Sequence, residues 1–218
     1  AKYGPRVFTC TMEEAIERSL IRDYAICVIG FRGDASAREL LQTAGKGKRK
    51  GKASEEEEEA LKRAALATCQ AQMLALSSAM HRRGLHKGFV FYSSINAAEN
   101  ARKVAEDMWE HGLFPQQAEA EGEGVLECCF CEYHSKQGTK ENEEELDRFR
   151  DASRDTSALV LMFNVRSLGV GVNVPDAQAE GILSGQATTE GVTQSVGRVL
   201  RHDVESACED AAILLPLM

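Results

Sequence analysis

Hydrophobic residues occur along this chain in two alternating patterns. Short apolar runs are separated by longer segments in which apolar residues recur every three or four positions. The first pattern is typical of buried β-strands and the second of amphipathic helices. Together they predict an α/β fold, a mostly parallel sheet with helices on both faces. We expect strands at residues 6–9, 24–31, 89–92, 125–133, 158–163, 179–183 and 211–217, and helices at 95–111, 139–150 and from Thr188 or Thr189 to Leu200.

Some segments predict more than their element type. The run from Tyr24 to Phe31 is apolar throughout, which favours a strand buried on both faces, as in parallel sheets. We expect Thr11 to cap a helical segment with Glu13 and Glu14 in its first turn, where negative charge suits the helix dipole. On the later helices we expect Thr139 as a cap and the inward-facing residues Ala98, Val104, Ala105, Met108, Leu146 and Phe149.

The segment from Thr43 to Glu59 differs in composition from the rest. Residues 45–52 alternate glycine with lysine and arginine, and residues 55–59 are five consecutive glutamates. This composition predicts a mobile surface loop that leads into a solvated helix start. We expect the helix to continue to Ala79, carrying Leu61, Leu66, Met73, Leu74 and Leu76. We therefore interpret residues 1–218 as one domain with an insertion at 43–82.

Composition limits the kinds of protein to consider. The net charge of -8 argues against binding nucleic acid through bulk charge, although a local basic cleft is compatible with it. Seven cysteines form no disulfide framework, which indicates a reducing compartment. No signal peptide and no apolar stretch of about 20 residues is present, so we expect a soluble intracellular protein of the cytoplasm, nucleus or nucleoid, with no membrane contact. The chain starts with Ala1 rather than methionine, and we expect flanking domains.

The segment from Gln194 to Arg201 carries the strongest chemical signal. On a helix, Gln194, Arg198 and Arg201 share one face, and two guanidinium groups with an amide suit phosphate oxygens. The alternative is a solvated helix face with incidental arginines. Gly197 argues against that alternative, because a glycine inside a helix costs about 1 kcal/mol relative to alanine.

Two further segments follow predicted strands. Residues 167–176 contain Gly169 and Gly171, which allow a tight loop at the carboxyl end of a strand, where ligands bind in open α/β sheets. Ser93, Ser94 and Asn96 follow the strand at 89–92; helix capping is the structural alternative to a ligand contact. His134 lies at the end of another strand, and we favour a partly exposed loop histidine there.

These segments resemble superfamily 2 helicases, closest to the restriction-subunit and excision-repair branches. Residues 194–201 match motif VI, Q-x-x-G-R-x-x-R; residues 167–176 are similar to motif V; and residues 88–96 are similar to motif IV. The resemblance covers residues 7–31 and 87–217. Asn173 stands where motif V usually has aspartate, so a ribose contact there would carry no charge.

The resemblance implies a second, C-terminal RecA-like lobe of the P-loop NTPase type. ATP with Mg²⁺ would be bound mainly by an N-terminal RecA-like lobe of the same polypeptide, and Arg198 and Arg201 would act on it catalytically. Gln194, Gly171 and Asn173 would contact the nucleotide. DNA or RNA would contact Ser93, Ser94, Asn96 and Ser167.

The resemblance also implies that the isolated chain does not hydrolyse ATP. Asn173 favours an alternative, a helicase-like lobe without catalysis that binds nucleic acid or protein. A third possibility is a nucleic-acid-binding domain that uses the basic loop at 45–52.

Two other patterns are rejected. Residues 45–53 do not form a phosphate loop, since Lys46 and Ala53 stand where the motif needs glycine and serine or threonine. Cys128, Cys131 and His134 have zinc-like spacing, but structural zinc needs four ligands, so we predict no metal and interpret the cysteines as buried thiols. Cys128 and Cys129 should point to opposite faces of their strand.

Overall fold

A computed structural model describes most of the chain. The described residues are 11–30, 55–118, 127–152, 157–165, 174, 176–183, 196–197, 199–200 and 210–217. Within them, six strands form one sheet in the order β1-β6-β5-β2-β4-β3, and every pairing is parallel. The sheet confirms the predicted α/β class and RecA-like fold.

The helices and strands follow the predicted order within a few residues at each end. The strands are β1 (Asp23–Gly30), β2 (Lys87–Phe91), β3 (Glu127–Tyr133), β4 (Ser157–Asn164), β5 (Ala179–Ile182) and β6 (Asp210–Leu217). The helices are α1 (Met12–Glu17), α3 (Glu55–Arg82), α4 (Ile95–Glu110), α5 (Pro115–Ala118) and α6 (Thr139–Asp151). The strand predicted at 6–9 and most of the helix predicted at 188–200 lie outside the described residues.

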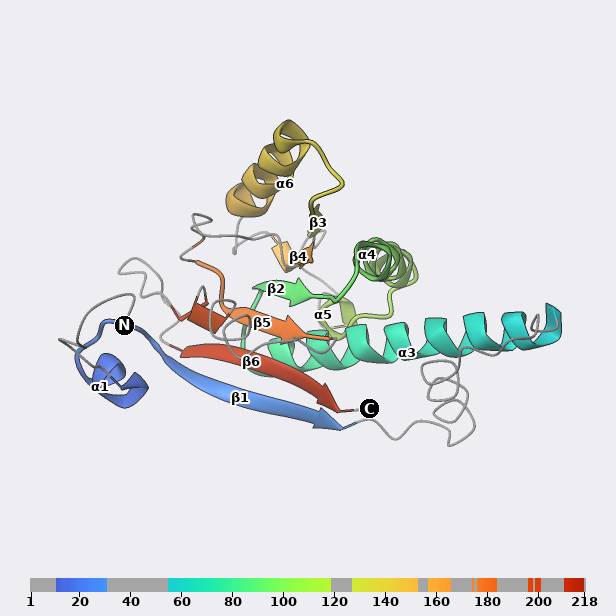
Figure 1. The fold of residues 1–218 in the computed structure, drawn as a ribbon. Helices are drawn as coiled ribbons and strands as arrows, with labels where there is room; N and C mark the ends of the chain where they lie inside the picture. Colours follow the sequence, from blue (N-terminus) through green and yellow to red (C-terminus); the bar gives the residue numbers. More distant parts are fainter. Residues whose placement is uncertain are drawn as a thin grey trace, which may run out of the picture.

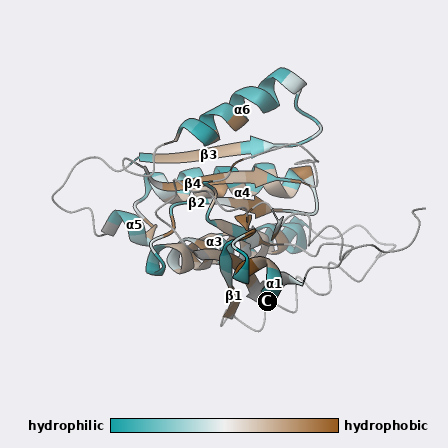
Figure 2. Ribbon diagram, turned by 90° about the vertical axis from the view of Figure 1, so that its left-hand side faces the viewer, coloured by the Kyte–Doolittle hydropathy of each residue, from teal (hydrophilic) through white to brown (hydrophobic). Residues whose placement is uncertain are grey.

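Two apolar clusters cover the two faces of the sheet. On one face α3 and α4 pack through Met73, Leu76, Ala105 and Met108, with the predicted inward residues of α4 among the buried or partly buried ones. On the other face α6 packs through Leu146 and Phe149, as predicted. Figure 1 shows α6 next to β3 at one edge of the sheet and β1 at the other. In Figure 2, β3 and β4 are mainly hydrophobic and α6 is mainly hydrophilic, as expected for a helix that buries one face only.

Strand β1 differs from its prediction. Among the described strands it pairs only with β6, and the side chains of Ile26 and Val28 are 58% and 57% exposed. The expectation of burial on both faces is therefore wrong. An apolar run shows that a segment is hydrophobic, but it does not show where a strand lies in a sheet. The edge position of β1 could therefore not be predicted from the run.

Helix α3 is longer than predicted and contributes to the core. Met73, Leu76 and Met80 are buried, whereas Leu66 and Leu74 are 47% and 38% exposed. The second half of the helix therefore packs on the sheet and the glutamate-rich start is exposed, as predicted. The assignment of residues 43–82 as an insertion stays a prediction.

The starts of α1 and α6 are capped by different hydrogen bonds. At α1 the hydroxyl of Thr11 accepts from Glu14 N at 3.1 Å, and the Glu14 carboxylate accepts from Thr11 N at 2.9 Å, which confirms the predicted cap. At α6 the cap is Gly138 and Thr139 is the first helical residue. The prediction missed by one position because Glu141 reaches back to Gly138 N at 3.1 Å.

Throughout the described helices, none is both long enough and apolar enough to cross a membrane.

Candidate functional site

The carboxyl end of β2 presents exposed polar groups. Phe91 is buried, whereas Ser93, Ser94 and Asn96 are exposed. The Ser94 hydroxyl accepts from Ala97 N at 3.3 Å, so Ser94 is the N-cap of α4. Within the described part of the chain, the side chains of Ser93 and Asn96 make no hydrogen bond. Two polar side chains without a hydrogen-bond partner among the described residues therefore lie at the N-terminus of a 16-residue helix, which is the positive end of the helix dipole.

Buried groups hold this strand end in place. Tyr92 N donates to Asn164 O at 3.0 Å, and the buried Asn164 amide points to Val90 O at 3.4 Å, which links β2 to β4. The Tyr92 ring stacks on Phe163, with 6.5 Å between ring centroids. Burial raises the pKa of Tyr92 far above its ordinary value, so its phenol stays neutral in the core. The exposed serines therefore follow a strand end that buried contacts hold in place.

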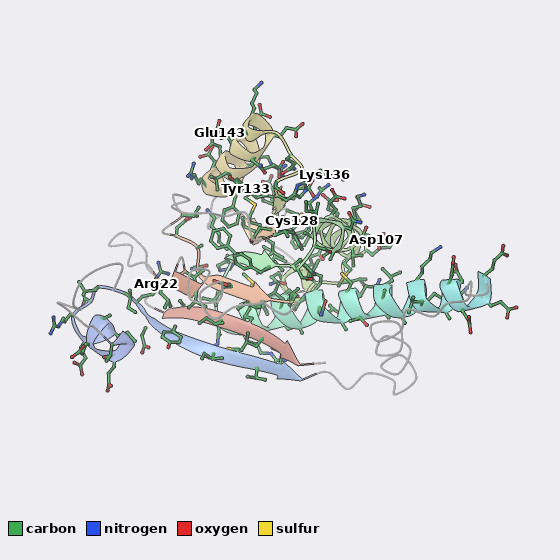
Figure 3. The ribbon with its side chains drawn as sticks, in the orientation of Figure 1. Arg22, Asp107, Cys128, Tyr133, Lys136 and Glu143 are labelled. Carbon is green, nitrogen blue, oxygen red and sulfur yellow. The ribbon has the colours of Figure 1, made fainter. Side chains whose placement is uncertain are left out.

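The neighbouring end of β3 has the opposite electrostatic character. A cavity of about 380 Å³ there is lined by Lys136, His134, Gln137 and five glutamates, among them Glu99 and Glu132. Lys136 Nζ lies 2.9 Å from Glu99 Oε1, and this contact lowers the pKa of Glu99. Figure 3 shows Lys136 and Tyr133 on this side of the sheet, away from Arg22. Because glutamates outnumber cations here, this side disfavours phosphates.

His134 is buried, contrary to expectation. It is 2% exposed, and its backbone is bracketed by Asn142, whose side chain accepts from His134 N at 3.2 Å and donates to His134 O at 3.0 Å. Its Nε2 lies 3.7 Å from Glu99 Oε1. The prediction of a partly exposed loop histidine is wrong because an amide on α6 holds the chain against the helix, a contact between residues eight positions apart.

Part of the predicted motif VI is described. Val199 and Leu200 are buried, Val199 in the cluster that also contains Phe149, and Leu200 O accepts from Arg22 N at 2.9 Å. Gly197 is exposed, and among the described residues no atom lies within 4 Å of the position that a Cβ would take there. Gln194, Arg198 and Arg201 lie outside the described residues, as do Ser167, Gly171 and Asn173 of motif V.

The last residue of the motif V segment belongs to a largely buried ion pair that the sequence did not suggest. Asp176 Oδ2 lies 2.6 Å from Lys87 Nζ at the start of β2, and Val174 is buried against α6 in the second apolar cluster. A pairing across 89 positions leaves no periodic signal.

The cysteines of β3 point to both faces of the sheet, as predicted. Cys128 belongs to the cluster under α4, whereas Cys129 and Cys131 belong to the cluster under α6. Of the three, only Cys131 is fully buried. Among the described residues, no group of three or more histidine, cysteine or acidic side chains is arranged to hold a metal ion.

Comparison with known proteins assigns the family. The chain matches the helicase conserved C-terminal domain over residues 70–203, which includes β2 to β5 and the motif VI segment. This chain belongs to the helicase C-terminal domain family. The motifs had predicted this helicase C-terminal domain. No curated protein matches its sequence.

Solved structures show the same helicase C-terminal fold at low sequence identity. The ATP-dependent Type ISP restriction-modification enzyme LlaBIII bound to DNA has a TM-score of 0.64 at 16% identity, over 96% of this chain and 13% of that one. A fragment of a type I restriction enzyme HsdR subunit from Vibrio vulnificus YJ016 has a TM-score of 0.63 at 15% identity, over 98% of this chain and 35% of that one. Mss116p DEAD-box helicase domain 2 bound to an RNA duplex has a TM-score of 0.50 at 11% identity, over 88% and 54%. This helicase domain thus spans only a minor part of the restriction enzymes it resembles.

Proposed function

We propose that this domain is the second lobe of an ATP-dependent helicase or translocase. In this proposal a first RecA-like lobe of the same polypeptide holds most of the ATP with its Mg²⁺. Arg198 and Arg201 reach the phosphates from this domain, Gln194 orders the same face, and Gly171 and Asn173 contact the nucleotide. Hydrolysis of the bound ATP would supply the free energy for movement along the strand.

The burial pattern in motif VI is the observation that carries this proposal. Val199 and Leu200 are buried and Gly197 is exposed. On an ideal helix with 3.6 residues per turn, positions 194, 198 and 201 would fall on the side opposite to positions 199 and 200. The open space at Gly197 fits the approach of a nucleotide from that side.

The path of nucleic acid follows the end of β2. Ser93 and Asn96 offer uncommitted polar side chains at the N-terminus of α4, where backbone N–H groups and the helix dipole favour phosphates. Ser94 would add its backbone, because its hydroxyl caps the helix. Ser167 would extend the same path from motif V. The similar structures include one bound to DNA and one to an RNA duplex, so either polymer is a candidate partner.

The arginine assignment is tested in the intact parent protein. Arg201→Ala and Arg198→Ala should each lower nucleic-acid-stimulated ATP turnover by roughly 10³-fold or more, since an arginine that stabilises the transition state is worth about 10³ to 10⁵ in rate. Arg150→Ala is the matched control, because Arg150 is paired with Asp147 on the exposed side of α6. Near wild-type turnover in both motif VI variants would refute the proposal.

A further inference from the structure

Two thiols face each other on the edge strand β3. Cys129 and Cys131 are two positions apart, so both side chains point to the face covered by α6. Their Sγ atoms are 3.4 Å apart. Cys128, labelled in Figure 3, lies on the other face of the strand. The strand therefore presents a dithiol and, next to it in the sequence, a single thiol in a different environment.

Groups on α6 make Cys129 unlike the other cysteines. Arg148 Nη2 lies 3.9 Å from Cys129 Sγ, and the guanidinium is held by Phe130 O at 3.2 Å and by Glu145 Oε1 at 2.7 Å. The contact with Cys131 and the charge of Arg148 lower the pKa of Cys129 to about 6, against burial and the charge of Glu145, which raise it. The pKa of Cys131 is raised, because its thiol donates to Cys129 and because it is buried. One sulfur is therefore a thiolate at neutral pH and its neighbour is a thiol.

The two sulfurs also differ in their exposure to solvent. Cys131 is 0% exposed, whereas Cys129 is partly exposed. Among the described strands β3 pairs only with β4, so no described strand of this sheet lies along its outer edge. A small solute can reach Cys129 first. Thiolate character and exposure together are what select a cysteine for oxidation.

We propose that Cys129 and Cys131 form an oxidative modification site for hydroperoxides, in which Cys129 is oxidised first and Cys131 resolves it. The Cys129 thiolate attacks the outer peroxide oxygen; a sulfur–oxygen bond forms, the O–O bond breaks, and the alkoxide or hydroxide that leaves takes up a proton. The product is a sulfenic acid, with sulfur oxidised by two electrons and the peroxide reduced. The Cys131 sulfur then attacks the Cys129 sulfur, a disulfide forms, and the hydroxyl leaves as water with the Cys131 proton.

The short distance between the two sulfurs favours a disulfide within one chain over a disulfide that joins two chains. A disulfide places its sulfurs about 2.05 Å apart, so the two sulfurs must approach by roughly 1.4 Å from their separation of 3.4 Å. Such a bond needs a local pucker of β3, which an edge strand tolerates better than a central one. A strained disulfide is easily reduced, so the modification should be reversible by a thiol reductant.

The test is oxidation of the folded, reduced chain with one equivalent of hydrogen peroxide at pH 7. Remaining thiols are then alkylated, and the peptides are mapped by mass spectrometry. We expect the peptide containing both residues to lose two hydrogen atoms and to escape alkylation at both. Without peroxide, iodoacetamide should modify Cys129 at least about tenfold faster than Cys128, since a pKa near 6 leaves most of the sulfur ionised at pH 7.

Variants assign the two roles. Cys131→Ser should stop at a sulfenic acid on Cys129 that dimedone traps, Cys129→Ser should leave Cys131 reduced, and Arg148→Gln should slow alkylation of Cys129. Cys128→Ser is the matched control and should behave as wild type. The proposal is overturned if Cys128 reacts before Cys129, if both thiols stay alkylatable after peroxide, or if the only disulfide joins two chains. Circular dichroism of each variant confirms that it is folded, and the dimedone trap in Cys131→Ser keeps the test decisive if Cys129→Ser does not fold.

Discussion

Lys87 Nζ lies 2.6 Å from Asp176 Oδ2, and the lysine side chain is 1% exposed while the aspartate side chain is 27% exposed. The same ammonium donates to Arg150 O at 3.1 Å and lies 5.4 Å from the centre of the Phe149 ring. The pair therefore joins the start of β2, the end of the motif V segment and the end of α6. A buried cation at this junction fixes where the motif V segment returns to the sheet.

The unequal burial of the pair predicts unequal costs of mutation. Asp176→Ala leaves an ammonium in the interior and should lower the free energy of unfolding by about 3 kcal/mol. Lys87→Met leaves a carboxylate that water can reach and should cost about 1 kcal/mol. Urea denaturation of both variants measures the difference. Equal costs, or a larger cost for Lys87→Met, would show that the aspartate is as desolvated as the lysine.

Two strand glycines predict a second contrast. A Cβ at Gly88 would lie 3.0 Å from Ala179 O and 3.1 Å from Ala179 Cβ, on a neighbouring strand whose backbone cannot move away. A Cβ at Gly181 would lie 2.8 Å from Leu76 Cδ1, the end of a side chain that can rotate. We expect Gly88→Ala to destabilise by about 2 to 3 kcal/mol and Gly181→Ala by less than about 1 kcal/mol. Thermal unfolding of the two variants, each beside wild type, ranks them; a reversed order contradicts the argument.

The sequence predicted element type better than element position. The alternation of apolar runs with amphipathic segments, as in α4 and its inward Ala98 and Met108, follows from periodicity within one segment. The edge position of β1, the burial of His134 and the Lys87–Asp176 pair depend on which segments become neighbours. Those contacts join residues that are far apart in the sequence, such as Asp23 of β1 with Asp210 of β6, and no local pattern records them.

For the candidate site, too, some features could be predicted from the sequence and others could not. The strand-end serines and the motif VI segment were found because their residue types follow a strand or share a helix face. That Ser94 is a cap while Ser93 is uncommitted required the structure. The dithiol had a readable signal, since residues i and i+2 of a strand share a face, but the nearby Arg148 on α6 did not.

The lowered pKa of Cys129 predicts a pH dependence of stability. A group whose pKa falls on folding stabilises the folded state above its unfolded value and loses that contribution as the pH falls through its folded value. For Cys129 the range runs from an ordinary value near 9 down to about 6. The free energy of unfolding of wild type minus that of Cys129→Ser should therefore increase from pH 6 to pH 8. Cys69 and Cys128, with pKa values raised to about 11, act only above that range. A difference that stays flat or falls would contradict the assignment.

The proposed two-lobe arrangement predicts that this chain alone does not turn over ATP. The proposed arginines act on a nucleotide that another lobe holds, so the purified chain should show no ATP hydrolysis above background, with or without single strands. Adding the parent's first lobe in trans should restore measurable turnover only if the lobes associate. A phosphate-release assay on the chain decides the first point, and robust turnover by the chain alone would defeat the two-lobe proposal.

The two strand ends predict where a nucleic-acid backbone runs. Ser93 and Asn96 lie uncommitted at the start of α4, whereas Ser135 is an exposed serine beside the glutamate-lined cavity at the end of β3. In the intact parent protein, Ser93→Ala with Asn96→Ala should weaken single-strand binding by about 5-fold or more, because each of the two lost phosphate contacts is worth about 0.5 to 1.5 kcal/mol. Ser135→Ala is the matched control and should bind as wild type. Fluorescence anisotropy at several salt concentrations separates the outcomes: unchanged affinity of the double variant at every salt concentration, or an equal loss in Ser135→Ala, would show that the strand does not follow the β2 end.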